Sequence, residues 1–386
     1  MPTAVSAKRL EDFFRKPHTI SLLLALLAYF VYVAFYRAGD SFGLEANLKR
    51  GLAVASFCFL LIAMLMFSDG PLIRPHPAFW KIVLGLSILY QLCLTVLLFQ
   101  AKGDARRFFA FLDSSLGVAL PERSYAEECG LSWRVIWNQM DLFVVAHLVG
   151  WYVKALLFRD YWLCWVISLM FEAMEYSLEH QLPNFAECWW DHWILDVATC
   201  NALGIWFGMK TCEYLKMKKY CWRGISCIPT YKGKIKRSIQ QFTPYSFSSF
   251  DWAPNKSLKN YIGVLFVIAS VLQCEVNHFY LKYLLWIPAD HLLNPARLLL
   301  FALMCAPCIH EIHSWLFDPK CPKLGPHAWL LLANIWTETI ICFKFADGEF
   351  PAPMPRAVKI FWAVLSVVVV GYPVVRFGIV KRRKSD

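Results

Sequence analysis

The sequence predicts an all-α fold, a polytopic membrane bundle of about ten transmembrane helices. The composition is the first reason: 58% of the residues are hydrophobic and 17% are charged, whereas soluble domains carry roughly 25% charged residues. The second reason is a mean hydropathy of +0.44. The third is that apolar runs of about 20 residues, the length that crosses a bilayer, recur along the chain. The net charge of +11 does not indicate nucleic acid, because the basic residues gather in a few loops.

The apolar runs set the expected organisation of the chain. We expect one integral membrane domain over residues 1–386, with residues 140–212 forming the catalytic spans, because these spans carry polar residues that should face the bundle interior. The expected spans are roughly 19–36, 51–68, 79–99, 140–158, 161–178, 192–212, 259–277, 293–313, 327–345 and 357–378.

The basic loops predict the orientation. Segment 213–258 holds nine Lys or Arg against two acids, and the chain ends in KRRKSD. The positive-inside rule therefore places the N-terminus (1–18), segment 213–258 and the tail (379–386) in the cytosol, and ten spans agree with that parity. Loop 179–191 then falls on the lumenal or external side.

Loop 101–139, also expected on the lumenal side, is long for a membrane connection. Near its end Trp133, Ile136, Trp137 and Met140 recur at helical spacing, which favours a helix lying in the interface. A cap over the bundle is the alternative. Most of the fourteen cysteines sit within apolar runs, but Cys129 and Cys188 fall in loops that could face an oxidising lumen, so a disulfide between them is a candidate.

The chemistry concentrates in residues 172–201, which contain no Lys or Arg. Ionisable groups at a membrane boundary are expensive and mark functional sites. Uncompensated carboxylates repel one another, and oxygen ligands without paired cysteines favour Ca²⁺, Mg²⁺ or Mn²⁺ over Zn²⁺. We interpret the stretch as a metal site; proton handling and a set of helix-end acids are the alternatives. Its six acids and two asparagines are Glu172, Glu175, Glu179, Asn184, Glu187, Asp191, Asp196 and Asn201.

Spacing decides which of these side chains can meet. Glu172 and Glu175 share a helix face, and Pro183 breaks the helix that follows. Asp196 and Asn201 are five residues apart and therefore off a common face of a straight α-helix, so both can be ligands only if that helix is tilted or distorted.

Two further polar residues lie in the fourth span. A lone histidine on an apolar face is most often a core residue, but His147 should lie beside the carboxylates, where an imidazole suits general-base work near neutral pH. Lys154 either pairs with an acid of the site, binds phosphate, or extends toward the membrane surface.

Outside this region the candidates are basic side chains in cytosolic turns. Arg74 and His76, and likewise Arg237 and Gln241, could bind lipid phosphate or anchor their turns at the headgroups. Several motifs are excluded: DGPLIR lacks the rest of the CDP-alcohol phosphotransferase signature, HEIH is not HExxH, and there is neither a P-loop nor a GxSxG elbow. The sequence therefore contains no recognisable device for a nucleotide or a serine ester.

Four segments together carry a family resemblance: RPHPAFWK (74–81), AHLVGWYVKALLFRDYWLCW (146–165), LPNFAECWWDHWILDVATCNALGIWFGM (182–209) and KIKRSIQQFTPYS (234–246). They resemble the eukaryotic base-exchange phosphatidylserine synthases. The resemblance runs from about residue 20 to about residue 345, and NFAECWWD is highly specific. Two segments, YSLEHQLPNFAECWWDHW and IPTYKGKIKRSIQQFTPYS, look more like the ethanolamine-exchanging type.

The resemblance implies a multi-pass enzyme of the endoplasmic reticulum that replaces the ethanolamine or choline of a phospholipid with L-serine, needs Ca²⁺ and uses no nucleotide. A homodimer is one candidate assembly. The positions that match the essential polar residues of that family are His147, Glu172, Glu175, Asn184, Glu187, Asp191, Asp196 and Asn201.

The resemblance also implies a set of regulatory positions. Arg74, His76, Cys164, Arg237 and Gln241 match positions linked to restraint by the product. His310 stands where the family usually has Arg, so feedback in this chain is expected to be weaker or pH-dependent.

The expected mechanism is displacement at phosphorus. Ca²⁺ held by some of Glu172, Glu175, Glu187, Asp191 and Asp196 polarises the lipid phosphate, while His147 takes the proton of the serine hydroxyl. Two other functions stay open at this point. A cation or proton-coupled transporter would need acids along a path across the bilayer, and a phospholipase-like hydrolase would use water in place of serine.

Overall fold

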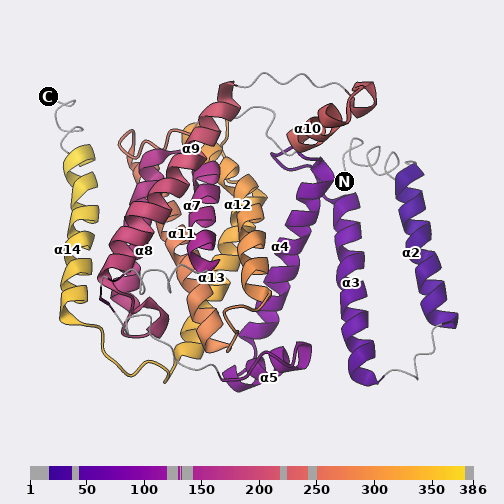
Figure 1. Cartoon of the computed structure of the whole chain (residues 1–386), viewed down its shortest axis with the longest axis horizontal. Helices are drawn as coiled ribbons and strands as arrows, with labels where there is room; N and C mark the ends of the chain where they lie inside the picture. Colours follow the sequence, from indigo (N-terminus) through magenta and orange to yellow (C-terminus); the bar gives the residue numbers. More distant parts are fainter. Residues whose placement is uncertain are drawn as a thin grey trace. The chain divides into compact units, whose positions relative to one another are not determined.

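The computed structural model describes residues 17–36, 43–119, 129–130, 132, 142–217, 224–241 and 250–378. The described residues form helices joined by turns, with no strand among them, which confirms the all-α fold (Figure 1). Contacts divide the chain into two compact units, residues 1–89 and residues 90–386.

The first unit contains α2 (Pro17–Phe35), α3 (Leu44–Met66) and the first part of α4 (Pro77–Leu98). Pro77 is the first residue of α4. A backbone N–H at that position has no acceptor within the helix, so a proline costs no hydrogen bond there. Gly85 allows α4 to approach α3 closely, since a Cβ there would lie 3.1 Å from Ala63 Cβ.

The second unit holds the remaining helices. They are α5 (Lys102–Leu112), α7 (Leu142–Phe158), α8 (Tyr161–Leu178), η2 (Pro183–Phe185), η3 (Asp191–Asn201), α9 (Ala202–Met217), η4 (Ile225–Cys227), α10 (Tyr231–Gln241), α11 (Leu258–Leu284), α12 (Leu293–Phe317), α13 (Pro326–Ala346), α14 (Arg356–Pro373) and η5 (Val374–Gly378). Within this unit α7, α8, α9, α11, α12 and α13 lie together as a bundle (Figure 1).

Each of the ten expected spans falls on a described helix. Six of the described helices, α3, α4, α11, α12, α13 and the α14–η5 segment, are long and apolar enough to cross a membrane by length and composition. Two shorter apolar helices lie at Ile20–Phe35 and Val144–Phe158. The chain is thus a multi-pass membrane protein, and about ten spans is compatible with its helices.

Close packing of α7 against α9 depends on two glycines spaced four apart. A Cβ on Gly204 would lie 2.6 Å from the backbone oxygen of Leu148, and one on Gly208 would lie 2.5 Å from Ala155 Cβ. Small residues at this spacing let membrane helices approach closely. The contact brings α7 and the end of η3 together, and both carry site residues.

A buried ion pair joins α12 to α13 elsewhere in the second unit. Arg297 Nη2 lies 2.6 Å from Glu338 Oε2, and the Glu338 side chain is fully buried. Asn277 of α11 donates to the same carboxylate oxygen at 3.3 Å, and the Tyr90 hydroxyl donates to the other. Because several donors satisfy this carboxylate, the charge is tolerated in the apolar interior.

Two polar helices, α5 and α10, lie within segments that the sequence predicted to be loops. α5 lies within loop 101–139: Lys102 Nζ donates to Phe345 O at 3.1 Å and Arg106 Nε to Leu284 O at 2.9 Å, which fixes α5 at the ends of α13 and α11. α10 lies within segment 213–258, and α9 continues into that segment as far as Met217. The predicted interfacial helix near 133–140 and both chain termini fall outside the described residues.

Candidate active site

Helix α8 positions two of the predicted acids. Its first turn is capped by Asp160, whose side chain accepts from the Leu163 N–H at 2.9 Å. Near its other end Glu172 and Glu175, three residues apart, are both buried, with 1% and 7% of their surface exposed. Ser168 lies one turn before Glu172, so the same face carries a hydroxyl as well.

The helix that follows has the distortion that the spacing of Asp196 and Asn201 requires. Residues 191–201 form a π-helix, with hydrogen bonds between residues five apart, before the chain continues as α9. In an α-helix residues five apart point about 140° from each other, whereas the wider turn of η3 brings them toward one face. π-helical turns occur frequently at functional sites.

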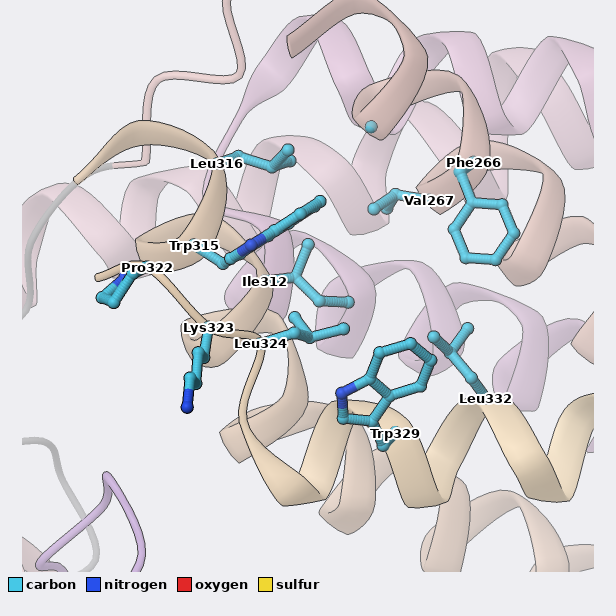
Figure 2. Close-up of a pocket in the computed structure, with 11 residues that line it drawn as sticks. Phe266, Val267, Ile312, Trp315, Leu316, Pro322, Lys323, Leu324, Trp329 and Leu332 are labelled. Atoms are coloured by element: carbon cyan, nitrogen blue, oxygen red, sulfur yellow. The ribbon is translucent and has the colours of Figure 1, made fainter. Parts of the chain in front are cut away.

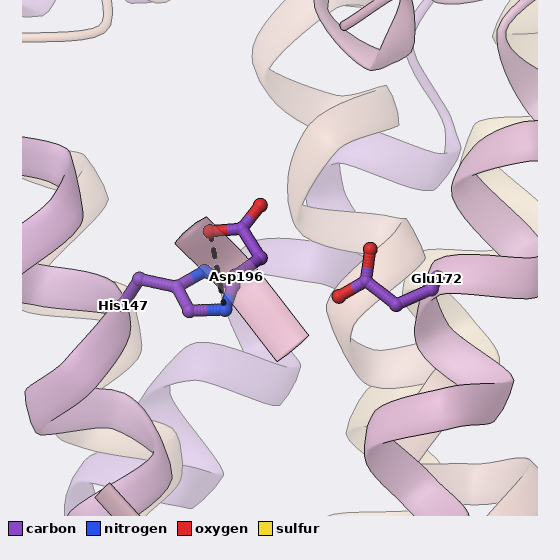
Figure 3. Close-up of side chains that lie close together, drawn as sticks. All are labelled: His147, Glu172 and Asp196. Atoms are coloured by element: carbon purple, nitrogen blue, oxygen red, sulfur yellow. Dashed lines mark ion pairs between the residues drawn. The ribbon is translucent and has the colours of Figure 1, made fainter. Parts of the chain in front are cut away.

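His147 of α7 meets this face. Its Nε2 lies 2.6 Å from Asn201 Oδ1 and 3.9 Å from Asp196 Oδ1. Asn201 is held in turn by α8, since its Nδ2 lies 2.8 Å from Ser168 Oγ and 3.4 Å from Glu172 Oε1. Figure 3 shows the carboxyl group of Glu172 facing the His147–Asp196 pair from the opposite side.

The Nε2 atom of His147 has a partner for each of its protonation states. The indole N–H of Trp151 lies 3.2 Å away and can donate only when Nε2 has a lone pair. The Asn201 oxygen can accept only when Nε2 carries a proton. This pair of partners suits an imidazole that takes up and releases a proton, and the His147 side chain is 26% exposed.

His192 is a site residue that the sequence reasoning missed. It is 1% exposed, and its Nδ1 lies 3.1 Å from Glu172 Oε2, 3.6 Å from Glu175 Oε2 and 4.0 Å from Glu187 Oε2. Tyr176 packs against its ring, with the ring centroids 4.4 Å apart. The signal was present, since His192 stands directly after Asp191 in the acidic stretch, but the reasoning counted only Lys and Arg as compensating cations.

The side chains fit a hard divalent cation. The potential ligand atoms form three groups, and within each group the atoms lie within 4.8 Å of one another. The groups are His147, Glu172 and Asp196; Glu172, Glu175 and His192; and Glu187, His192 and Asp196. Buried Glu175 Oε2 has no hydrogen-bond donor among the described residues, nor has His192 Nε2 a partner there. Carboxylate oxygens predominate, which favours Ca²⁺, Mg²⁺ or Mn²⁺. Asp191 is buried at the start of η3, but none of these groups of described residues includes it.

Glu187 lies in the loop before η3. Burial, with the carboxylates of Asp191 and Glu172 adding to it, raises the pKa of Glu187 to about 7, although His192 acts in the opposite direction. A bound cation would favour the ionised carboxylate. The next residue, Cys188, forms a disulfide with Cys129, which confirms the candidate disulfide and ties this loop to the segment before α7.

An apolar groove lies at a different place. It lies between α11, α12 and α13, has a volume of about 470 Å³, and is lined mostly by apolar side chains that include Phe266, Trp315 and Trp329 (Figure 2). Only Lys323 brings a charge to it. The groove suits an acyl chain and contains none of the predicted site residues.

Comparison with known proteins places the chain in a family. The profile of the family described as "Phosphatidyl serine synthase" matches residues 75–346. Phosphatidylserine synthase 2 of Homo sapiens is 43% identical over 376 residues, which cover 95% of this chain and 77% of that protein. The chain belongs to the phosphatidylserine synthase family. It is therefore a phospholipid-modifying transferase, as the resemblance implied.

Other relatives carry different names. Phosphatidylserine synthase 1 of Danio rerio is 40% identical, over 90% of this chain and 76% of its own length. The relative in Oryza sativa, 42% identical over 92% of this chain and 87% of its own length, is named CDP-diacylglycerol–serine O-phosphatidyltransferase 2. The name of the rice relative gives CDP-diacylglycerol as the phosphatidyl donor and serine as the acceptor, whereas the name phosphatidylserine synthase gives only the product.

The positions matched to product restraint in the phosphatidylserine synthases are spread over several elements. Arg74 and His76 belong to the first unit, where Arg74 O accepts from the Trp80 indole at 2.6 Å and His76 Nδ1 from the Ala78 N–H at 3.1 Å. In the second unit, Arg237 Nη1 lies 2.8 Å from Gln241 Oε1 on α10.

Two more of these positions are on helices of the bundle, α8 and α12. Cys164 is fully buried in α8. His310 of α12 lies near the Phe250 ring, with centroids 6.3 Å apart. The feedback role of all these residues stays a prediction. The catalytic role of Asn184 also stays a prediction, and its side chain lies outside the described part of the structure.

Proposed function

We propose that this member of the phosphatidylserine synthase family exchanges the headgroup of phosphatidylethanolamine, or of phosphatidylcholine, for L-serine in a Ca²⁺-dependent reaction. One observation carries the proposal: His147 Nε2, with a donor and an acceptor at hydrogen-bond distance, stands beside buried carboxylates that have no Lys or Arg among them. That arrangement suits a base next to a cation site.

The residues have distinct tasks in the exchange. His147 removes the hydroxyl proton of serine as its oxygen attacks phosphorus, and returns that proton to the oxygen of the departing ethanolamine. Asn201 fixes the imidazole and accepts from it while it is protonated, and Asp196 stabilises the resulting positive charge. Glu172, Glu175, Glu187 and Asp196 would hold Ca²⁺, which lowers the charge repulsion between the lipid phosphate and the incoming oxygen.

The balance of bonds explains why no energy-rich donor is required. One phosphodiester bond forms to the serine oxygen as one breaks to the ethanolamine oxygen, so substrate and product are both phosphodiesters. The absence of a recognisable nucleotide-binding motif in the sequence favours this donor over CDP-diacylglycerol, which the name of the rice relative implies for that protein.

We place the site on the lumenal side of the endoplasmic reticulum membrane, with both termini in the cytosol. The Cys129–Cys188 disulfide supports this placement, because it joins the two loops expected in the lumen and disulfides persist in oxidising compartments. A lumenal site would also meet Ca²⁺ concentrations suited to a flexible site of modest affinity.

A reconstituted assay tests the proposal. Purified protein in liposomes receives labelled L-serine with phosphatidylethanolamine, phosphatidylcholine or CDP-diacylglycerol, each with Ca²⁺ and with chelator. We expect labelled phosphatidylserine and one free ethanolamine or choline per label, only with Ca²⁺. Labelling with CDP-diacylglycerol alone, accompanied by CMP, would replace the exchange reaction. Headgroup release without serine would indicate a hydrolase.

A further inference from the structure

A second pair of charges lies inside the membrane-spanning bundle, next to the candidate site. Lys154 Nζ of α7 is 2.7 Å from Glu275 Oε1 of α11, and the two side chains are 22% and 19% exposed. Lys154 is the only Lys or Arg in α7, α8 and η3, and Glu275 is the only acid in α11. Ionisable residues inside a membrane are costly, pair with one another and mark substrate pathways.

The ammonium of Lys154 is directed toward the base. Lys154 follows His147 by seven residues, two turns that put both on one face of α7 with about 10 Å between their backbones. Long side chains on a helix lean toward its N-terminus, which is the direction of His147. Trp151 connects the two: Lys154 Nζ lies 3.9 Å from the centroid of its ring, and its indole nitrogen lies 3.2 Å from His147 Nε2.

The negative charge of the candidate site favours a cation such as the Lys154 ammonium beside the substrate phosphate. A phosphodiester is an anion, and it must enter a site surrounded by Glu172, Glu175, Glu187 and Asp196. A divalent ion offsets only part of that charge. Lysine is a common phosphate ligand, and its ammonium has three donors that can bind phosphate oxygens when a substrate enters.

We infer that Lys154 binds the phosphodiester of the phospholipid substrate, and that Glu275 holds the ammonium in place between turnovers. Lys154 is thus a substrate-binding residue beyond the carboxylate and histidine set. The inference rests on the proposed function only for the identity of the donor lipid, since any phosphatidyl donor brings a phosphate to His147.

The experiment separates phosphate binding from a structural ion pair. Removing both charges of a buried pair is close to neutral for stability, so the double variant Lys154→Met/Glu275→Gln should fold. Glu275→Gln alone keeps the ammonium. The matched control is Lys210→Met/Glu213→Gln, an exposed pair on α9 with 2.9 Å between its charged atoms. For each, KM for phospholipid in mixed micelles and KM for serine are measured beside thermal stability.

If the inference is correct, loss of the Lys154 ammonium and loss of the Glu275 carboxylate should have different effects on KM for phospholipid. We expect KM for phospholipid to rise tenfold or more in the double variant while KM for serine changes less than twofold. In Glu275→Gln we expect KM for phospholipid at or below the wild-type value, and in the control no change. Lys154→Arg, which keeps the charge, should keep KM for phospholipid close to the wild-type value. If the double variant does not accumulate, Lys154→Met alone takes its place, and its KM for phospholipid should rise tenfold or more.

Several results would overturn the inference. A wild-type KM for phospholipid in the folded double variant would contradict the inference. An equal rise of KM for phospholipid in Glu275→Gln and in Lys154→Met would also contradict it. Every variant is assayed with phosphatidylethanolamine and with CDP-diacylglycerol. If wild type uses only CDP-diacylglycerol, the exchange reaction fails, but the KM comparison on that donor still decides the role of Lys154.

Discussion

His147 Nε2 and Asn201 Oδ1 lie 2.6 Å apart, although 54 residues separate them along the chain. The contact joins α7 to the last residue of a π-helix, and Asn201 is itself held by Ser168 and Glu172 of α8. One amide therefore links the proposed base to the acidic face of the neighbouring helix.

The first prediction concerns this contact. We expect His147→Ala to reduce kcat by at least about a hundredfold, the usual contribution of a general base, and Asn201→Ala to reduce it by roughly tenfold, because the imidazole loses a buried hydrogen bond. Serine incorporation into phosphatidylserine measures both. His291→Ala, which removes a histidine elsewhere in the second unit, is the control; a kcat for His147→Ala within a factor of three of this control would contradict the assignment.

The second prediction concerns the metal. Chelation should abolish serine incorporation, and added Ca²⁺ should restore it. Glu172→Gln should raise the Ca²⁺ concentration needed for half-maximal activity by more than about tenfold, because a charged ligand is lost. Glu179→Gln on the exposed end of the same helix should shift it less than about twofold. Equal Ca²⁺ dependence in the two variants would argue against Glu172 as a ligand.

The third prediction concerns His192. Its imidazole lies within 4.0 Å of three carboxylates and is almost fully buried. Replacement by Leu leaves those acids without their partner, a change that typically costs about 3–5 kcal/mol. We expect His192→Leu to lower the melting temperature strongly in chelator and much less with Ca²⁺. If Ca²⁺ changes the melting temperature of neither the wild type nor His192→Leu, the acids and His192 do not form a cation site.

The fourth prediction concerns the Cys129–Cys188 disulfide, which joins two cysteines 59 residues apart in the sequence. Cys129→Ser should destabilise the protein by about 2–4 kcal/mol and reduce activity, because Cys188 adjoins Glu187. Mass tagging of thiols before and after reduction measures the bond directly. Tagging of Cys129 and Cys188 without reduction in protein from native membranes would show that these loops do not face an oxidising compartment.

The sequence predicted the helical elements well where hydropathy carried the signal. All ten apolar runs fall on helices, since burial in lipid requires continuous apolar length and internal backbone hydrogen bonds. α5 was missed although its sequence, KGDARRFFAFL, is strongly amphipathic, because a polar segment of that length is below the size of a span. The ends of α11 and α12 extend beyond the expected limits, to Leu284 and Phe317.

The sequence by itself determined that the site is built from the carboxylates of residues 172–201 together with His147, because uncompensated carboxylates between apolar runs are informative in any arrangement. Only the tertiary structure decided how they meet. The π-helix turns Asp196 and Asn201 toward α7, Gly204 and Gly208 set the approach of α9 to α7, and His192 lies among the acids, with its Nδ1 3.1 Å from Glu172 Oε2. Lys154 finds Glu275 across 121 residues of chain. These pairings depend on contacts between distant helices, and the periodicity of a single helix carries no record of them.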